Sequence, residues 1–121
     1  GVRNVEQKGL ATIAKETREL AGKAREKRLQ PSDYEGSTFT TSNLGMFGIE
    51  EFTAIINPPN ACILAIGAIR DTPVVDDGEI VPGMRMKITL SCDHRIVDGA
   101  VGAQFLGTVQ RYLEDPLNLM L

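Results

Sequence analysis

The chain contains no tryptophan, a single histidine and two cysteines, and it has no excess of positive charge over its 121 residues. Its 13 Lys and Arg are outnumbered by 16 Asp and Glu, giving a net charge of −3. Nucleic acids and anionic membranes bind surfaces with clustered basic residues. A membrane-spanning helix needs an apolar run of about 20 residues, which this sequence lacks. We therefore expect no nucleic-acid partner and no membrane partner.

The two cysteines, Cys62 and Cys92, form neither a Cys-x-x-Cys motif nor a regular disulfide framework, which favours a reducing compartment. Together with His94 they match no compact zinc motif, and a fourth ligand is missing. We therefore expect no metal site. The length fits one soluble domain, because typical domains hold about 100–150 residues.

Apolar residues recur at helical spacing near both ends of the chain. From Leu10 to Ala24 they predict an amphipathic helix of several turns, and Pro31 lies beyond its end. The same spacing after Gly99 predicts a second helix, which continues to Asp115-Pro116.

The segment between these helices has strand patterns. Residues 37–42 are rich in hydroxyl and β-branched side chains, and residues 61–69 are nearly all apolar, which predicts a strand buried on both faces. Asp76-Asp77-Gly78 predicts a hairpin turn, and strict alternation over residues 84–92 predicts one continuous strand. The order of elements indicates an α/β fold, an α+β or mixed sandwich with a largely antiparallel sheet and flanking helices.

The one histidine, His94, follows the alternating strand in a polar loop, where functional side chains are often found. A neutral imidazole can accept a proton and return it within one turnover near neutral pH. His94 could be a general base, with Asp98 organising the loop or capping the following helix. It could also activate Cys92 as a nucleophile, although alternation points Cys92 toward the core. The simplest alternative is a structural histidine with no chemical role.

Several blocks resemble one family of enzymes in order and spacing. Asp93-His94-Arg95-Ile96-Val97-Asp98-Gly99 resembles the His-x-x-x-Asp-Gly motif of the dihydrolipoyl acyltransferases, the E2 components of 2-oxo acid dehydrogenase complexes, which are related to chloramphenicol acetyltransferase. The segments 39–49, 54–59 and 61–67 resemble further blocks of that family. The resemblance covers essentially the whole chain and is greatest for the pyruvate dehydrogenase branch.

The resemblance implies transfer of an acetyl group between dihydrolipoamide and coenzyme A. His94 would take the proton from the attacking thiol, and Ser42 would donate a hydrogen bond to the oxyanion. Asp98 would hold the histidine loop, and Asn43 would lie with Ser42 at the coenzyme A end of the channel. Without the family, Ser42 would be interpreted as a strand-end hydroxyl and Asn43 as a loop residue.

The resemblance also implies an assembly and a place in the cell. Residues 1–121 would form the C-terminal half of the catalytic domain of a homotrimer, with the histidine and the serine of one site on different subunits. Trimers would build a cubic or dodecahedral core that binds E1 and E3 through domains outside this chain. The apolar segments 46–49 and 117–121 are candidate contacts in such a core. The compartment would be the bacterial cytoplasm or the mitochondrial matrix.

Three other functions remain open at this point. The chain could belong to a non-catalytic component of the same core, to an E2 specific for another acyl group, or to a separate acyltransferase acting on a small hydroxyl substrate. The presence of both His94 and Asp98 argues against an inert scaffold.

Overall fold

The structure is a computed structural model that describes residues 1–120, and the chain divides into two compact units, residues 1–38 and residues 39–121. In the first unit, helix α1 (Leu10–Arg25) confirms the predicted amphipathic helix and is preceded by the 3-10 turn η1 (Val5–Gln7). Pro31 lies beyond the end of α1, as predicted, and it is also the first residue of a short second helix, α2 (Pro31–Tyr34). The first N–H groups of a helix have no partner within the helix, so the missing N–H of proline costs nothing there.

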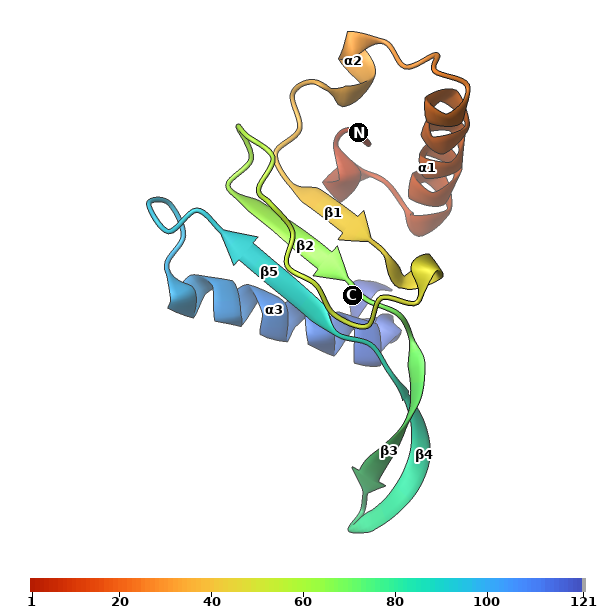
Figure 1. Cartoon of the computed structure of the whole chain (residues 1–121), viewed down its shortest axis with the longest axis vertical. Coiled ribbons are helices and arrows are strands. Elements are labelled where there is room, and N and C mark those ends of the chain that lie inside the picture. The colour runs from red at the N-terminus through yellow and green to blue at the C-terminus, as the bar shows by residue number, and fades with distance from the viewer. Residues whose placement is uncertain (121) are drawn as a thin grey trace. The chain divides into compact units, whose positions relative to one another are not determined.

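The second unit is built on a three-stranded mixed sheet in the order β1-β2-β5 (Figure 1). Strand β1 (Thr40–Asn43) runs parallel to β2 (Cys62–Ile66), which pairs antiparallel with β5 (Ile88–Cys92). The first predicted strand therefore exists but starts three residues later than residue 37. Strand β2 is central and its middle three residues are buried, which confirms the interpretation of the apolar run.

The predicted hairpin is confirmed. Strands β3 (Arg70–Asp76) and β4 (Glu79–Arg85) pair antiparallel and form a separate two-stranded sheet, which extends away from the main sheet in Figure 1. The turn residues Asp77 and Gly78 have φ values of 50° and 78°. Two successive left-handed residues give the type I′ turn that matches the twist of a two-residue hairpin.

The continuous strand predicted over residues 84–92 is wrong. Met84 and Arg85 end β4, residues 86 and 87 form a link, and β5 begins at Ile88 in the other sheet. The alternation in the sequence continues through these two residues although neither belongs to a strand. Alternation of apolar and polar residues indicates which face of a sheet each side chain lies on, but it does not indicate which strand pairs with the segment.

Helix α3 (Gly99–Glu114) confirms the second predicted helix and packs against β5 (Figure 1). A Cβ atom placed on Gly102 would lie 3.5 Å from Cys92 Sγ and 3.6 Å from a Leu90 methyl carbon. The rings of Phe39 and Phe105 extend this contact, with centroids 5.6 Å apart. Cys92 and Leu90 therefore face the helix, as the alternation predicted.

Apolar side chains remain exposed at the two segments predicted to make assembly contacts. Met46 and Phe47, in the 3-10 turn η2 (Gly45–Phe47), are 73% and 74% exposed, and Leu117, in η3 (Pro116–Met120), is 71% exposed. Leu121 lies outside the described residues. Among the helices of residues 1–120, none is long and apolar enough to cross a membrane.

Gly67 follows β2 where the chain leaves the main sheet, and its missing side chain allows a close backbone contact. An added Cβ would lie 1.9 Å from the carbonyl oxygen of Glu50, beside the hydrogen bond of 2.8 Å from Ala68 N to the Ile49 carbonyl oxygen. We expect Gly67→Ala to lower the free energy of unfolding by about 1–3 kcal/mol, because a backbone oxygen cannot move aside cheaply. Thermal or denaturant unfolding measures the change.

Gly107→Ala is the matched control for this substitution. Gly107 lies inside α3 with open space around it, and Gly→Ala in a helix interior stabilises by about 0.5–1 kcal/mol. Equal effects of the two substitutions would contradict the proposed close approach at Gly67.

Candidate functional site

The turn that carries His94 begins where the β2–β5 ladder ends. The backbone N–H of Asp93 donates to the carbonyl oxygen of Ala61 over 2.7 Å, which is the last rung between the two strands. The carbonyl oxygen of Asp93 then accepts from the N–H groups of Ile96 and Val97, each at 2.9 Å. The chain therefore reverses at once after the sheet, and His94 lies on the outside of the bend.

The side chain of Asp93 binds the same turn from the other side. Its Oδ1 accepts from the backbone N–H of Arg95 at 3.1 Å and from Arg95 Nε at 3.0 Å, and its Oδ2 accepts from a terminal guanidinium nitrogen at 2.8 Å. These bonds from Arg95 lower the pKa of the Asp93 carboxyl to about 2. The carboxylate is therefore ionised throughout the physiological pH range.

His94 itself is exposed, and within residues 1–120 its imidazole makes no hydrogen bond and no ion pair. It lines a hollow of about 560 Å³ that lies between its own turn and the segment before β2. Asn60, on the far wall, is only 5% exposed, and its amide donates to the Thr40 hydroxyl over 2.5 Å. The hollow thus has a fixed wall on one side and a free imidazole on the other.

Asp98 caps helix α3. It has extended backbone angles, and its carboxylate accepts from the backbone N–H of Val101 over 2.9 Å. The capping role suggested by the sequence is confirmed, and the cap also fixes the point at which the histidine turn must end.

Cys62 and Cys92 face each other across the sheet, with their Sγ atoms 3.5 Å apart and both thiols free. Burial, followed by the neighbouring Cys62 thiol, raises the pKa of Cys92. A raised thiol pKa reduces the thiolate that a nucleophile requires. The cysteine-nucleophile alternative therefore has no support in this geometry. Among the described side chains, no three His, Cys, Asp or Glu groups could hold a metal ion together.

Strand β1 ends at one end of the sheet and β5 ends at the other (Figure 1), so Ser42 and Asn43, the last residues of β1, lie far from the turn that follows β5. Ser42 is level with Ala65 of β2, which is level with Thr89 of β5, and the histidine turn starts only after Cys92. Three residues along a strand cover about 10 Å and two strand spacings cover about another 10 Å, so Ser42 and Cys92 are roughly 14 Å apart. One chain does not bring Ser42 to His94.

Both residues near the end of β1 are accessible. Ser42 is half-buried, and within the described part of the chain its hydroxyl makes no hydrogen bond, not even the local backbone bond that a structural serine would form. Asn43 is exposed, and its Oδ1 accepts from the backbone N–H of Gly45 over 2.9 Å. Asn43 therefore holds the turn after the strand.

The comparisons with known proteins agree with one another. The family model "2-oxoacid dehydrogenases acyltransferase (catalytic domain)" matches residues 1–121. The chain belongs to this family. The mitochondrial dihydrolipoyllysine-residue acetyltransferase component of the pyruvate dehydrogenase complex of Caenorhabditis elegans is 57% identical over 120 residues, which are 98% of this chain and 24% of that protein. The corresponding component of Rickettsia bellii is 45% identical and covers 99% of this chain and 29% of its own length.

Solved structures of the family show the same fold. Dihydrolipoamide acetyltransferase of Azotobacter vinelandii, studied for the roles of a serine, a histidine and an asparagine in its catalytic mechanism, superposes with a TM-score of 0.94 at 39% identity. The cubic core of a pyruvate dehydrogenase multienzyme complex superposes with a TM-score of 0.94 at 38% identity. Each match covers 99% of this chain and 49% of the solved chain, so the chain spans about half the length of these relatives and less of the curated ones. The acyltransferase fold predicted from the resemblance is confirmed.

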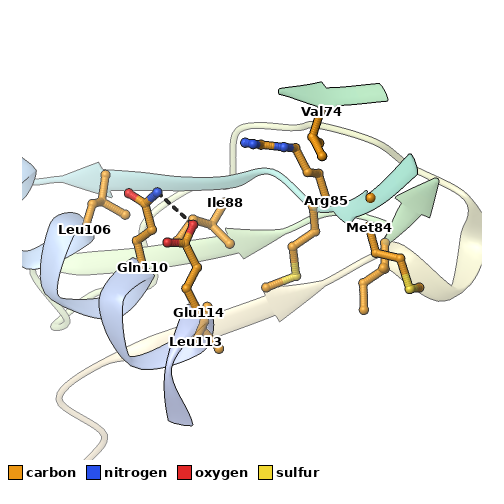
Figure 2. Close-up of a pocket in the computed structure, with 11 residues that line it drawn as sticks. Val74, Met84, Arg85, Ile88, Leu106, Gln110, Leu113 and Glu114 are labelled. Carbon is orange, nitrogen blue, oxygen red and sulfur yellow. Dashed lines mark hydrogen bonds between the residues drawn. The ribbon is translucent and has the colours of Figure 1, made fainter. Parts of the chain in front are cut away.

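A second hollow of this chain, about 730 Å³, lies between the base of the β3–β4 hairpin and the C-terminal half of α3 (Figure 2). Its wall is mainly aliphatic and methionine side chains, with Gln110 bonded to Glu114 over 3.0 Å. None of the four predicted site residues lines it. The hollow beside His94, although smaller, is therefore the candidate active site.

Two features of this site have no counterpart among the sequence-based predictions. They are the bond between Asp93 and Arg95 and the buried position of Asn60 in the wall of the hollow. A carboxylate two residues before an arginine, at the end of a strand, is a local signal that could have indicated the first. The burial of Asn60 depends on its distant partner Thr40 and has no local signal.

The cap at Asp98 gives the first prediction for this site. Asp98→Ala should lower the free energy of unfolding by about 1 kcal/mol, because the N–H of Val101 loses its acceptor. Asp98→Asn should keep most of that stability, since an amide oxygen caps nearly as well. Denaturant unfolding of the three proteins measures both, and an equal loss in the two variants would show that charge, not capping, is the important property.

The Asp93 carboxyl gives a pH prediction. Its pKa is lower in the folded chain than the ordinary value of about 3.9, so its ionised form stabilises the folded state above that pH. The contribution is lost as the pH falls toward about 2. The stability of the parent relative to Asp93→Asn should therefore be constant between pH 5 and 8, where the carboxyl is ionised in both the folded and the unfolded chain because these values lie about one unit or more above the ordinary pKa, and should fall below pH 4. Unfolding measured across that range tests it, and a constant difference down to pH 2 would refute the assignment.

Proposed function

We propose that this chain is part of the catalytic domain of a dihydrolipoamide acetyltransferase, which moves an acetyl group between dihydrolipoamide and coenzyme A. The observation that carries the proposal is the exposed imidazole of His94, held on a tightly bonded turn beside a hollow and left without a partner among the described side chains. An unused imidazole on a fixed backbone is suited to proton transfer near neutral pH.

The positions of the predicted residues support this assignment. The serine and histidine studied in the Azotobacter vinelandii enzyme are separated by the same 52 positions as Ser42 and His94, and its asparagine follows the histidine by four positions, as Asp98 does here. This chain has aspartate in place of that asparagine. Both residues are good helix caps, so the substitution preserves the bond that Asp98 makes to α3.

The proposed reaction needs no covalent enzyme intermediate. His94 takes the proton from the thiol of coenzyme A, and the resulting thiolate attacks the carbonyl carbon of acetyl-dihydrolipoamide. The carbonyl oxygen becomes an oxyanion that accepts a hydrogen bond from Ser42. When the intermediate collapses, the carbon–sulfur bond to dihydrolipoamide breaks, and the leaving thiolate takes the proton back from His94. The reverse reaction follows the same steps.

The separation of Ser42 from His94 within one chain supports a site formed between two copies. A hydrogen-bond donor acts only within about 3 Å of the oxyanion, whereas these residues are at opposite ends of the sheet. A homotrimer in which one subunit gives the histidine and its neighbour gives the serine meets the requirement. Exposed apolar side chains at Met46, Phe47 and Leu117 are available for such contacts.

The wider assembly follows from the same proposal. Residues 1–121 would supply the C-terminal half of the domain, and the other half would complete the channel walls. Trimers would assemble into an E2 core, with E1 and E3 bound through other domains. Relatives come from mitochondria and from bacteria, which supports the mitochondrial matrix or the bacterial cytoplasm as the location.

Replacing His94 tests the chemistry. His94→Ala in the intact enzyme should reduce acetyl transfer from acetyl-coenzyme A to free dihydrolipoamide by at least 10²-fold, because a positioned general base contributes about 10²–10⁴-fold. Activity within tenfold of the parent would refute the role of His94. It would also favour the alternative of a non-catalytic core component.

Replacing Ser42 tests the oxyanion role and the shared site together. Ser42→Ala should lower kcat by about 10²–10³-fold with little change in KM, since the hydrogen bond forms only in the transition state. When the Ser42→Ala and His94→Ala proteins are unfolded and refolded as a mixture, some sites regain both residues and activity returns. A mixture of the double variant with either single variant is the control and should stay inactive. If the mixture of Ser42→Ala and His94→Ala proteins stays as inactive as the controls, a site shared between subunits is ruled out.

A further inference from the structure

The pair Asp93 and Arg95 lies on either side of His94, and we propose that the two are positioning residues, which fix the histidine turn and balance the charge beside the imidazole. The inference rests on the proposed function, since it assigns these residues a role toward a proton-transferring His94. It concerns residues that touch His94 only through the backbone and the local field, so neither is proposed to contact a reacting atom.

Every polar group of Asp93 makes a hydrogen bond. Its N–H donates to the carbonyl oxygen of Ala61, immediately before β2, its carbonyl oxygen accepts two backbone N–H groups of the turn, and its carboxylate accepts three bonds from Arg95. One of those three comes from the Arg95 backbone, so residues 93 and 95 are bonded directly to each other. His94 is the residue between them, and its backbone is held from both sides.

The exposure of the pair indicates that Asp93 is the more important member. The Asp93 side chain is 20% exposed, whereas the Arg95 side chain is 89% exposed. A solvent-exposed ion pair stabilises a fold little. The pair therefore contributes little to global stability, and its main effect is on the position of the histidine turn. A displacement of about 1 Å at a catalytic group can reduce turnover by as much as about 10²-fold.

Asp93 and Arg95 also determine the net charge beside the imidazole of His94. The charged groups around His94 are Asp93 and Arg95 in its turn and Asp98 at the start of α3, and Cys92 is a further titratable group in the wall of the hollow. The remaining lining residues carry no charge: Ile56, Pro58, Pro59, Asn60 and Ile96. The carboxylate and the guanidinium cancel while they are paired, so each neutralising substitution leaves the opposite charge unbalanced beside the imidazole.

Opposite shifts in two variants would identify this balance. Arg95→Gln leaves the Asp93 carboxylate, which favours the protonated imidazole, so the titration midpoint of His94 should rise. Asp93→Asn leaves the guanidinium and should lower it. The two shifts should be opposite in sign, and the double variant should return close to the parent.

The measurement does not depend on catalysis. The ¹³Cε1 signal of His94, assigned by its loss in His94→Gln, gives the titration midpoint in each variant of the intact protein. Arg18→Gln, at an exposed position on α1, is the control for a general loss of one positive charge and should leave the midpoint unchanged. Shifts in the same direction, or none, would refute the charge balance even if His94 proved to be catalytic.

Kinetics test the positioning. Asp93→Asn and Arg95→Gln should each lower kcat by about tenfold with the KM for coenzyme A unchanged, a smaller loss than the limit expected for a 1 Å displacement. Arg95→Lys keeps the charge but cannot reproduce the bidentate hydrogen bonds to the Asp93 carboxylate. This variant should therefore keep the titration midpoint of the parent while losing part of kcat. A raised KM with normal kcat would overturn the inference and make Arg95 a substrate contact. If His94→Ala stays active, the proposed function fails, and the NMR shifts still decide the charge balance.

Discussion

The antiparallel ladder between β2 and β5 is the interaction on which the candidate site depends. It joins Cys62 to Cys92 at one end and Ile66 to Ile88 at the other, and its last rung is the bond from Asp93 to Ala61. Because that rung fixes Asp93, it also fixes where the chain bends, where His94 points outward and where Asp98 can start α3. The helix in turn covers the sheet at Leu90 and Cys92. Sheet, turn and helix thus form one rigid support for a single exposed imidazole.

The same sheet keeps the second predicted group away. β1 runs parallel to β2, so its end at Ser42 and Asn43 lies at the edge opposite to the histidine turn. Strand β2 pairs parallel with β1 on one side and antiparallel with β5 on the other. The end of β1 at Ser42 and the turn after β5 therefore lie at opposite ends of the sheet. One chain therefore holds Ser42 and His94 at opposite ends of one sheet. The exposed apolar side chains near β1 and at η3 are surfaces on which the proposed contacts between subunits could form.

Local physics made much of the fold predictable. The spacing of apolar residues located α1 and α3, because one face of each helix differs from the other over several turns. The Asp76-Asp77-Gly78 sequence located the hairpin, because two successive left-handed residues favour a type I′ turn. The continuous strand over residues 84–92 was wrong for an equally physical reason: alternation persists through the link at Met86 and Lys87 while the hydrogen-bonding partner changes from β3 to β2.

The sequence by itself determined the residue types and intervals of the site, and hence the family. His94, Asp98 and Ser42 stand at fixed positions in segments whose order needs no coordinates to recognise. The cap at Asp98 and the bond between Asp93 and Arg95 join residues two or three positions apart, and both have local signals in the sequence. Only the tertiary structure decided that Ser42 lies at the far end of the sheet from the histidine turn, and that the buried Asn60 lies in the wall of the hollow beside that turn. These two facts depend on strand order and strand direction, which arise from contacts between residues far apart in the chain and have no local pattern.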